Sequence, residues 1–187
     1  MTQIRIDSTV LAAVAVAQST DPDRYYLRGV CFDGADTVAT DGKILTHAPD
    51  SATRDDNNEP IVYPVSKKAI TALRRRNSTH AVFDGTTMSV YSKQGIPVYL
   101  EPCQAIDGTF PDWRRVIPEV SDGATGQGAF ASALLSRIAL TATTLGEEKT
   151  VSVKLTGDDE HTAHLVHYRN GEILPTYSVI MPTHAKR

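Results

Sequence analysis

The sequence predicts an α+β fold made of long antiparallel sheets and three helices that lie across them. One plan repeats in three stretches of about sixty residues: a strand-like entry, a helical segment, and β-rich sequence that ends at a proline. Within the β-rich parts, apolar and polar residues alternate, as Val151, Val153 and Leu155 do with their polar neighbours. A fixed repeat indicates a fold assembled from one supersecondary unit, and the alternation indicates half-buried strands.

The composition excludes several classes of protein. Hydrophobic residues make up 41% of the 187 residues and charged residues 22%, which is enough apolar sequence to bury a core and excludes a mainly disordered chain. No apolar run approaches the ~18 residues of a membrane helix, and the N-terminus lacks a secretion signal. Two cysteines are too few for a disulfide framework or a four-ligand zinc site. We therefore expect a cytoplasmic protein with no membrane partner.

The first unit is expected over residues 1–60. It starts with a strand in TQIRIDS, continues with a helix over residues 8–19, and then has strands in the segments 25–34 and 36–49. The polar segment 51–60 is expected to be a connector to the second unit.

The second unit is expected over residues 61–120. A strand in IVYPVS leads to a helix over residues 67–76, and strands follow in HAVFDG, TMSVYS and IPVYLEP. Phe-Asp-Gly occurs at residues 32–34 and again at 83–85. Each copy stands between two strand-like runs, where Asp-Gly favours a tight hairpin.

The third unit follows a polar linker at residues 121–128. It has a short strand-like entry in GAF, a helix over residues 131–143, and strands in the segments 150–157, 161–168 and 175–182.

The helix expected after Ser66 has one cationic face. Ser66 is a natural N-cap, and an apolar side formed by Ala69, Ile70, Ala72 and Leu73 would face the core. Lys67, Lys68, Arg74 and Arg75 fall on the other side without any acidic residue, although the chain as a whole has a net charge of −3. Such a face attracts phosphate. The alternative is a solvated helix face whose cations interact favourably with the C-terminal end of the helix dipole.

No catalytic or metal-binding constellation is found in the sequence. On a strand, His161 and His167 point to one face and His164 to the other, so the three cannot converge on a metal ion. Phosphate-binding glycine loops, nucleophile elbows and zinc-protease motifs are absent from the sequence. We therefore expect no enzyme activity, no metal and no cofactor, and instead a binding or scaffolding role.

Three segments of this chain resemble a known family. RYYLRGV at residues 24–30, followed by TVATDGKIL at 37–45, resembles the middle domain of the bacterial DNA polymerase III beta sliding clamp. IDGTFPDWRRVIP at 106–118 resembles the closing strand of that domain, and YSVIMP at 177–182 resembles the end of the clamp's last domain. The motifs are long, occur in the family's order and extend over nearly the whole chain.

The resemblance implies a DNA-clamp fold of repeated β-α-β-β-β units, with antiparallel sheets outside and helices facing a central hole. Clamps of this family are closed rings that encircle duplex DNA and tether the replicative polymerase. Residues 1–120 would form a middle-like domain of two units, 121–128 a linker, and 129–187 a half-domain that resembles the end of the last domain. The function expected is that of a sliding clamp, a processivity factor for DNA replication.

The resemblance also suggests two sites. The first contacts duplex DNA without reading its sequence, and it would use the cationic helix, an arginine that matches one directed toward DNA in the family, and the single cation of the third helix: Arg24, Lys67, Lys68, Arg74, Arg75 and Arg137. The second is an apolar pocket for short peptides of DNA polymerases and other clamp partners, formed by Thr40, Gly42, Leu45, Pro118, Val179, Met181 and Pro182. The alternative is that the pocket residues are ordinary core residues beside a domain boundary.

Assembly and partners follow from the number of units. A family ring contains twelve units in two chains of six, so a chain of three units would need four copies, and we expect a homo-tetrameric ring. A clamp loader is a further candidate partner. The competing interpretation is a clamp-like interaction protein, or decoy, that binds clamp partners without encircling DNA.

Overall fold

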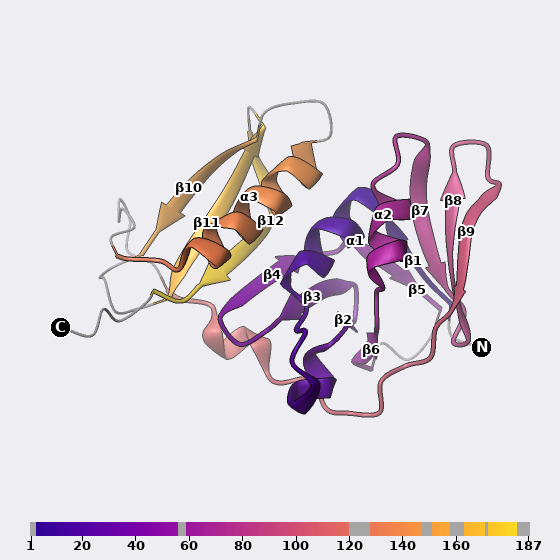
Figure 1. Ribbon diagram of the computed structural model, residues 1–187, viewed down its shortest axis with the longest axis horizontal. Helices are drawn as coiled ribbons and strands as arrows, with labels where there is room; N and C mark the ends of the chain where they lie inside the picture. Colours follow the sequence, from indigo (N-terminus) through magenta and orange to yellow (C-terminus); the bar gives the residue numbers. More distant parts are fainter. Residues whose placement is uncertain are drawn as a thin grey trace.

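The computed structural model describes residues 3–55, 59–119, 128–146, 151–157, 163–170 and 172–182. Two antiparallel sheets form one layer of the molecule and three helices form the other (Figure 1). The helices are α1 (Ser8–Val14), α2 (Lys67–Leu73) and α3 (Ser132–Gly146). Helix α1 lies between the other two and contacts both (Figure 1).

The order of elements confirms the α+β fold with its repeated unit. The first unit contains β1 (Ile4–Asp7), α1, β2 (Val30–Asp33), β3 (Asp36–Thr40), β4 (Ile44–Ala48) and β5 (Ala52–Arg54), with 3-10 turns at Ala15–Ala17 and Pro22–Leu27. The second contains β6 (Ile61–Tyr63), α2, β7 (Ser78–Phe83), β8 (Thr87–Ser92), β9 (Pro97–Pro102) and a 3-10 turn at Trp113–Val116. The third contains α3, β10 (Ser152–Thr156), β11 (His164–Asn170) and β12 (Glu172–Ile180).

The first two units exchange their leading strands. Strand β1 of the first unit pairs antiparallel with β7 of the second, and β6 of the second unit pairs antiparallel with β2 of the first. The five-stranded sheet therefore has the order β5-β1-β7-β8-β9. Because each unit completes the other unit's sheet, the two share one core, which contains Ile4, Phe32, Tyr63 and Phe83.

The third unit joins the first through a strand pair. Strand β12 pairs antiparallel with β4, placing Leu45 opposite Val179 and Ile44 opposite Ile180. The result is one seven-stranded sheet with the order β10-β11-β12-β4-β3-β2-β6. The sheet runs across the junction without a break, so α3 lies beside α1 on the same side of the sheet (Figure 1).

Helix α1 is buried almost completely. The Asp7 carboxylate caps it by accepting hydrogen bonds from the backbone N–H groups of Thr9 and Val10. Residues 11–14 have 0% exposure, because α2 and α3 cover the two flanks and the sheets cover the remaining side. This enclosure explains why α1 is apolar on nearly all sides and carries no charged residue.

Four expectations about individual segments are wrong. The second helix ends at Leu73 and not at Arg76, because the Ser78 hydroxyl donates to the Ala72 carbonyl and closes the last turn. The connector at 51–60 contains an edge strand, β5, that pairs with β1. The segment 106–118 is not a closing strand, and GAF forms no strand in its described residues. The linker expected at 121–128 lies outside the described residues apart from Gly128.

The segment 106–118 instead covers the outer face of the seven-stranded sheet. The Trp113 indole N–H donates to the Asp33 carboxylate at 2.9 Å, and the Arg114 guanidinium stacks on the Trp113 ring while it pairs with Asp33 and Asp36. Burial alone would raise the pKa of Asp33, but the hydrogen bonds from Arg114 and Trp113 outweigh it and hold that pKa below its ordinary value. A second, smaller core lies beneath the segment and contains Cys31, Val38, Leu45, Val62, Trp113 and Val179.

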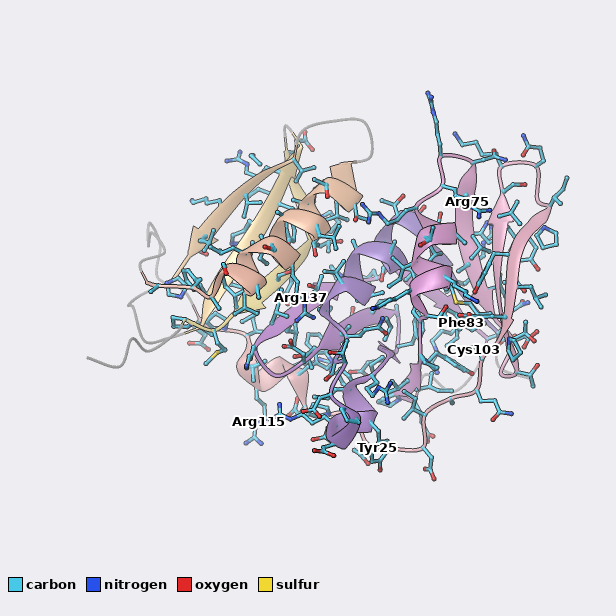
Figure 2. The ribbon with its side chains drawn as sticks, viewed as in Figure 1. Tyr25, Arg75, Phe83, Cys103, Arg115 and Arg137 are labelled. Atoms are coloured by element: carbon cyan, nitrogen blue, oxygen red, sulfur yellow. The ribbon has the colours of Figure 1, made fainter. Side chains whose placement is uncertain are left out.

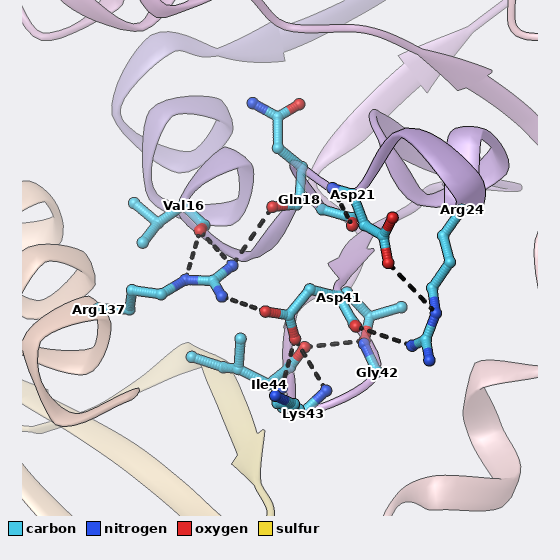
Figure 3. Close-up of polar contacts among 11 residues, drawn as sticks. Val16, Gln18, Asp21, Arg24, Asp41, Gly42, Lys43, Ile44 and Arg137 are labelled. Carbon is cyan, nitrogen blue, oxygen red and sulfur yellow. Dashed lines mark hydrogen bonds and ion pairs between the residues drawn. The ribbon is translucent and has the colours of Figure 1, made fainter. Parts of the chain in front are cut away.

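Arg137 of α3 fastens the third unit to the first (Figure 3). Its Nε and Nη2 atoms donate to the Val16 carbonyl at 3.0 and 2.7 Å, at the C-terminal end of the first helical segment, where a cation is favoured. Its Nη1 atom pairs with the Asp41 carboxylate, in the turn between β3 and β4. Burial by itself would raise the pKa of Asp41, but hydrogen bonds from the Ile44 and Lys43 N–H groups and the charge of Arg137 hold it below its ordinary value.

We predict that Arg137→Met destabilises the chain by roughly 2–3 kcal/mol, because it leaves the Asp41 carboxylate and the Val16 carbonyl without their shared donor. Arg115→Met is the matched control, since the Arg115 side chain is 82% exposed, and it should change stability by less than about 0.5 kcal/mol. Urea unfolding of the two variants measures the difference. Equal losses would contradict a fastening role for Arg137.

Candidate functional site

Helix α2 and the turn that follows it present the predicted cations to solvent. The Ser66 hydroxyl caps the helix by accepting from the Ala69 N–H at 3.0 Å, and it donates to the Glu101 carboxylate at 2.8 Å. Ala69, Ala72 and Leu73 are buried against the sheets. All four predicted cations are exposed, Lys67 and Lys68 in the first turn of α2 and Arg74 and Arg75 directly after its end, and not on one face of a longer helix.

A hollow beside the end of α2 extends this basic surface. It encloses about 360 Å³, and its lining includes Arg74, Arg75, Arg76 and Lys93 together with threonines of α1 and α3. Figure 2 shows Arg75 close to α2 and β7. Sequence reasoning missed Lys93, because it lies in the turn after β8, and only the pairing of β7 with β8 brings it beside the end of α2, where its N–H donates to the Asn77 carbonyl at 3.0 Å.

Arg24 lies on a different part of the surface. Its side chain is 51% exposed, pairs with Asp21 at 3.8 Å and donates to the Asp41 carbonyl at 3.4 Å (Figure 3). The guanidinium lies over Gly42, where a Cβ atom would come within 2.7 Å of Nη1. The tip of this exposed side chain could move aside, but Gly42 also has φ +87°, which favours glycine, so the turn itself requires this residue.

Arg137 is placed differently from the other predicted DNA contacts. Its side chain is only 24% exposed, and its nitrogens already donate hydrogen bonds to the Val16 and Gln18 carbonyls and to the Asp41 carboxylate. Figure 2 shows it between α3 and the first unit, away from Arg75. We therefore leave Arg137 out of the surface that we propose below for DNA.

The residues predicted for a peptide pocket gather at the junction of the first and third units, but most are buried. Leu45 and Val179 form a cross-strand pair, each 3% exposed, beneath the segment 106–118. The Thr40 hydroxyl donates to the Ile44 carbonyl at 2.8 Å and accepts from the Gly42 N–H at 3.0 Å, so it holds the turn.

Met181 is the large apolar side chain of this group that solvent reaches. It is 43% exposed, and its N–H donates to the Lys43 carbonyl at 3.0 Å, which fixes it beside the turn that contains Gly42. Pro182 is buried and Pro118 is half-buried. The arrangement combines an exposed, adaptable thioether side chain with a buried apolar pair, Leu45 and Val179, in the adjoining strands.

The histidines and cysteines considered above as metal ligands or reactive groups lie, where the structure describes them, in strands or in the core. His164 is fully buried against Phe130, whereas His167 lies on the other face of β11 beside Thr156, as the strand alternation predicts. His161 lies outside the described residues. Among the described residues, no group of three or more histidine, cysteine, aspartate or glutamate side chains is placed to hold a metal ion. Burial raises the pKa of both Cys31 and Cys103 to about 12, which keeps these thiols protonated.

No helix in the described part of the chain is long and apolar enough to cross a membrane.

The two sheets, the exchanged strands and the helix layer define the fold as that of a sliding clamp. Solved structures of DNA polymerase III beta subunits match this chain. The DnaN sliding clamp of Bartonella birtlesii, bound to griselimycin, matches over 98% of this chain and 66% of its own, with a TM-score of 0.68 and 18% identity. A Pseudomonas aeruginosa sliding clamp with ligand matches over 97% of this chain and 66% of its own, with a TM-score of 0.62 and 15% identity.

The beta subunit of Thermotoga maritima matches over 98% of this chain and 66% of its own, with a TM-score of 0.59 and 15% identity. No protein-family model and no curated protein matches the sequence. The predicted resemblance is thus confirmed for the fold, in a shortened form. The chain spans 66% of the length of these clamps.

Proposed function

We propose that the protein is a sliding clamp, a binding protein and not an enzyme, which holds duplex DNA against its helix layer without reading the base sequence. The observation that carries the proposal is the exposed basic surface of the second unit, formed by Lys67, Lys68, Arg74, Arg75 and Lys93. A chain with a net charge of −3 gathers these cations on one helix and its adjoining hollow. Contacts of lysine and arginine with phosphate fix position on DNA but carry no sequence information.

Exposed cations at this surface bind phosphate by releasing counterions, so affinity depends steeply on salt. Arg24 is proposed as an additional contact, because half of its side chain is exposed. The alternative of a merely solvated helix face makes a different prediction, since it expects no loss of DNA binding when the cations are removed.

We predict that changing Lys67, Lys68, Arg74 and Arg75 to alanine weakens binding equally for duplexes of different sequence. The slope of log affinity against log salt should flatten by roughly one unit for each lost phosphate contact. Fluorescence anisotropy with two unrelated duplexes measures both effects. Arg115→Ala with Arg169→Ala, two exposed cations outside the helix layer, serves as the control and should keep the wild-type slope.

We propose further that the chain assembles into a ring of four copies. Strands β10 and β9 end the two sheets in the described part of the chain, and they lie at opposite ends of the molecule (Figure 1). Uncovered strand edges favour association, and closed symmetric oligomers remove them. Three units per chain and twelve per family ring give four chains. A decoy that binds clamp partners needs neither the ring nor the basic surface.

A closed ring should remain on circular DNA and slide off linear DNA. We predict that, after a high-salt wash, the protein stays on a nicked plasmid and leaves the same plasmid cut once, because only a topological hold resists salt. The fraction of protein retained on bead-bound plasmid measures the topological hold. Linearising the nicked plasmid with a restriction enzyme after binding should release the protein. Equal retention on both forms would reject the ring and favour the decoy.

The junction of the first and third units is the proposed docking site for short peptides of a DNA polymerase, and a clamp loader is a candidate for the same site. Met181 supports this proposal, because an exposed thioether over an apolar base suits a leucine or aromatic anchor. Thr40, Gly42, Leu45, Pro118, Val179 and Pro182 would hold the turn and the base of the site.

We predict that Met181→Ala lowers affinity for a short peptide with leucine and aromatic anchors by about 1–3 kcal/mol and leaves stability nearly unchanged. Leu45→Ala should instead destabilise the fold by about 2–5 kcal/mol, because Leu45 is a core residue. Peptide titration and urea unfolding separate the two effects. Unchanged peptide affinity in Met181→Ala would place the peptide site elsewhere.

A further inference from the structure

Among the described residues, no strand covers the third unit in the way that the first two units cover each other. Strand β2, which follows α1, is covered by β6, and β7, which follows α2, is covered by β1. The exchange is reciprocal, and α1 contacts α2. Two units of this kind therefore complete one another through the same side of each, as in a two-fold contact.

Strand β10 occupies the corresponding place in the third unit, directly after α3. The opposite edge of that unit, β12, is already used by β4. Strand β10 ends the seven-stranded sheet, with no further strand beside it in the part of the chain that the structure describes. Figure 1 shows β10 and α3 together at the end of the molecule away from β9.

The flank of α3 on this side is uncharged and partly apolar. Arg137 points toward the first unit, and at 100° per residue Leu135 projects about 160° away from it. Leu135 is 44% exposed, and the small residue Ala139 follows on the same flank one turn later. Arg137 is the single charged residue between Ser132 and Gly146, so this flank offers nothing to phosphate or to a charged peptide.

We propose that this side of the third unit, the Leu135–Ala139 flank of α3 with the edge of β10, binds the same side of a second copy of the chain. Two third units then lie side by side through their α3 flanks and β10 edges, as the first and second units lie side by side with α1 against α2. A second copy fits because the contact repeats this side-by-side relation, and two uncharged α3 flanks meet without repulsion.

The inference deepens the proposed function and rests on it, because it names one of the two contacts in a ring of four chains. The contact between β4 and β12 joins the third strand after α1 to the third strand after α3, and β9 is the third strand after α2. Because the proposed contact joins the β10 sides of two copies, the β9 side of each copy is left to meet the β9 side of another copy. Third units meet third units and second units meet second units, which gives a tetramer with three perpendicular two-fold axes.

Substitution at Leu135 tests the contact. Leu135→Arg should halve the solution mass, measured by light scattering without DNA at about 50 μM chain, because two like charges face each other across the two-fold axis. Leu140→Arg is the matched control, a leucine of the same helix with 40% exposure that projects about 60° from Arg137, and it should keep the wild-type mass. An unchanged mass for Leu135→Arg, or a wild-type mass equal to the 20.3 kDa of one chain, would overturn the inference.

Cysteine cross-linking keeps the test decisive if Leu135→Arg fails to fold. Ala139→Cys should give a covalent dimer under mild oxidation, whereas Thr71→Cys on the exposed face of α2 should not, and the native Cys31 and Cys103 are buried and unreactive. Dimer from neither variant or from both would reject the contact. The basic-surface variant is the one with Lys67, Lys68, Arg74 and Arg75 changed to alanine. If it loses DNA binding while the Ala139→Cys dimer is absent, this inference fails and the proposed DNA-binding function is retained. If the Ala139→Cys dimer forms but the basic-surface variant keeps the wild-type DNA affinity, the proposed function fails instead.

Discussion

The antiparallel pairing of β4 with β12 is the interaction on which the rest of the arrangement depends. It turns the strands of the first and third units into one sheet and thereby sets α3 beside α1. Arg137 can reach the Val16 carbonyl and Asp41 only because the strands hold the two units in this register. The small core beneath Trp113 also spans the same strand pair, since it contains both Leu45 and Val179.

One consequence is an uneven distribution of charge over the helix layer. Helix α1 is enclosed by its neighbours and can carry no charge without burying it, and the single cation of α3 is used inside the molecule. Cations that remain available to a phosphate backbone therefore gather at α2, in the turn after it and in the neighbouring hollow. The second unit is the part of the chain that we propose to contact DNA.

Much of the fold and part of the site followed from the sequence. The Ser66 cap, the apolar side of α2 and the alternation in β10 are local patterns, and local patterns survive folding when the tertiary structure does not oppose them. The exchange of β1 and β6 was not predicted, because a period-2 pattern marks a strand without naming its neighbour. Strand β5 lies in a polar segment whose composition indicates a connector, and only its pairing with β1 defines it as a strand. The resemblance implies a strand at 106–118, where the chain instead forms a 3-10 turn at Trp113–Val116.

The sequence by itself determined the α+β class, the threefold plan, the clamp resemblance and the cationic residues of α2 and the turn after it. The cationic residues and the strand alternation depend on residues near one another in the chain, and the threefold plan and the resemblance depend on the order in which such local patterns recur. Only the tertiary structure decided the environment of single side chains. Arg137 joins the third unit to the first, Leu45 and Val179 lie in the core, and Met181 is exposed to solvent. Burial and partners depend on which distant strands pair, and in this chain the pairing of β4 with β12 brings together residues more than a hundred positions apart.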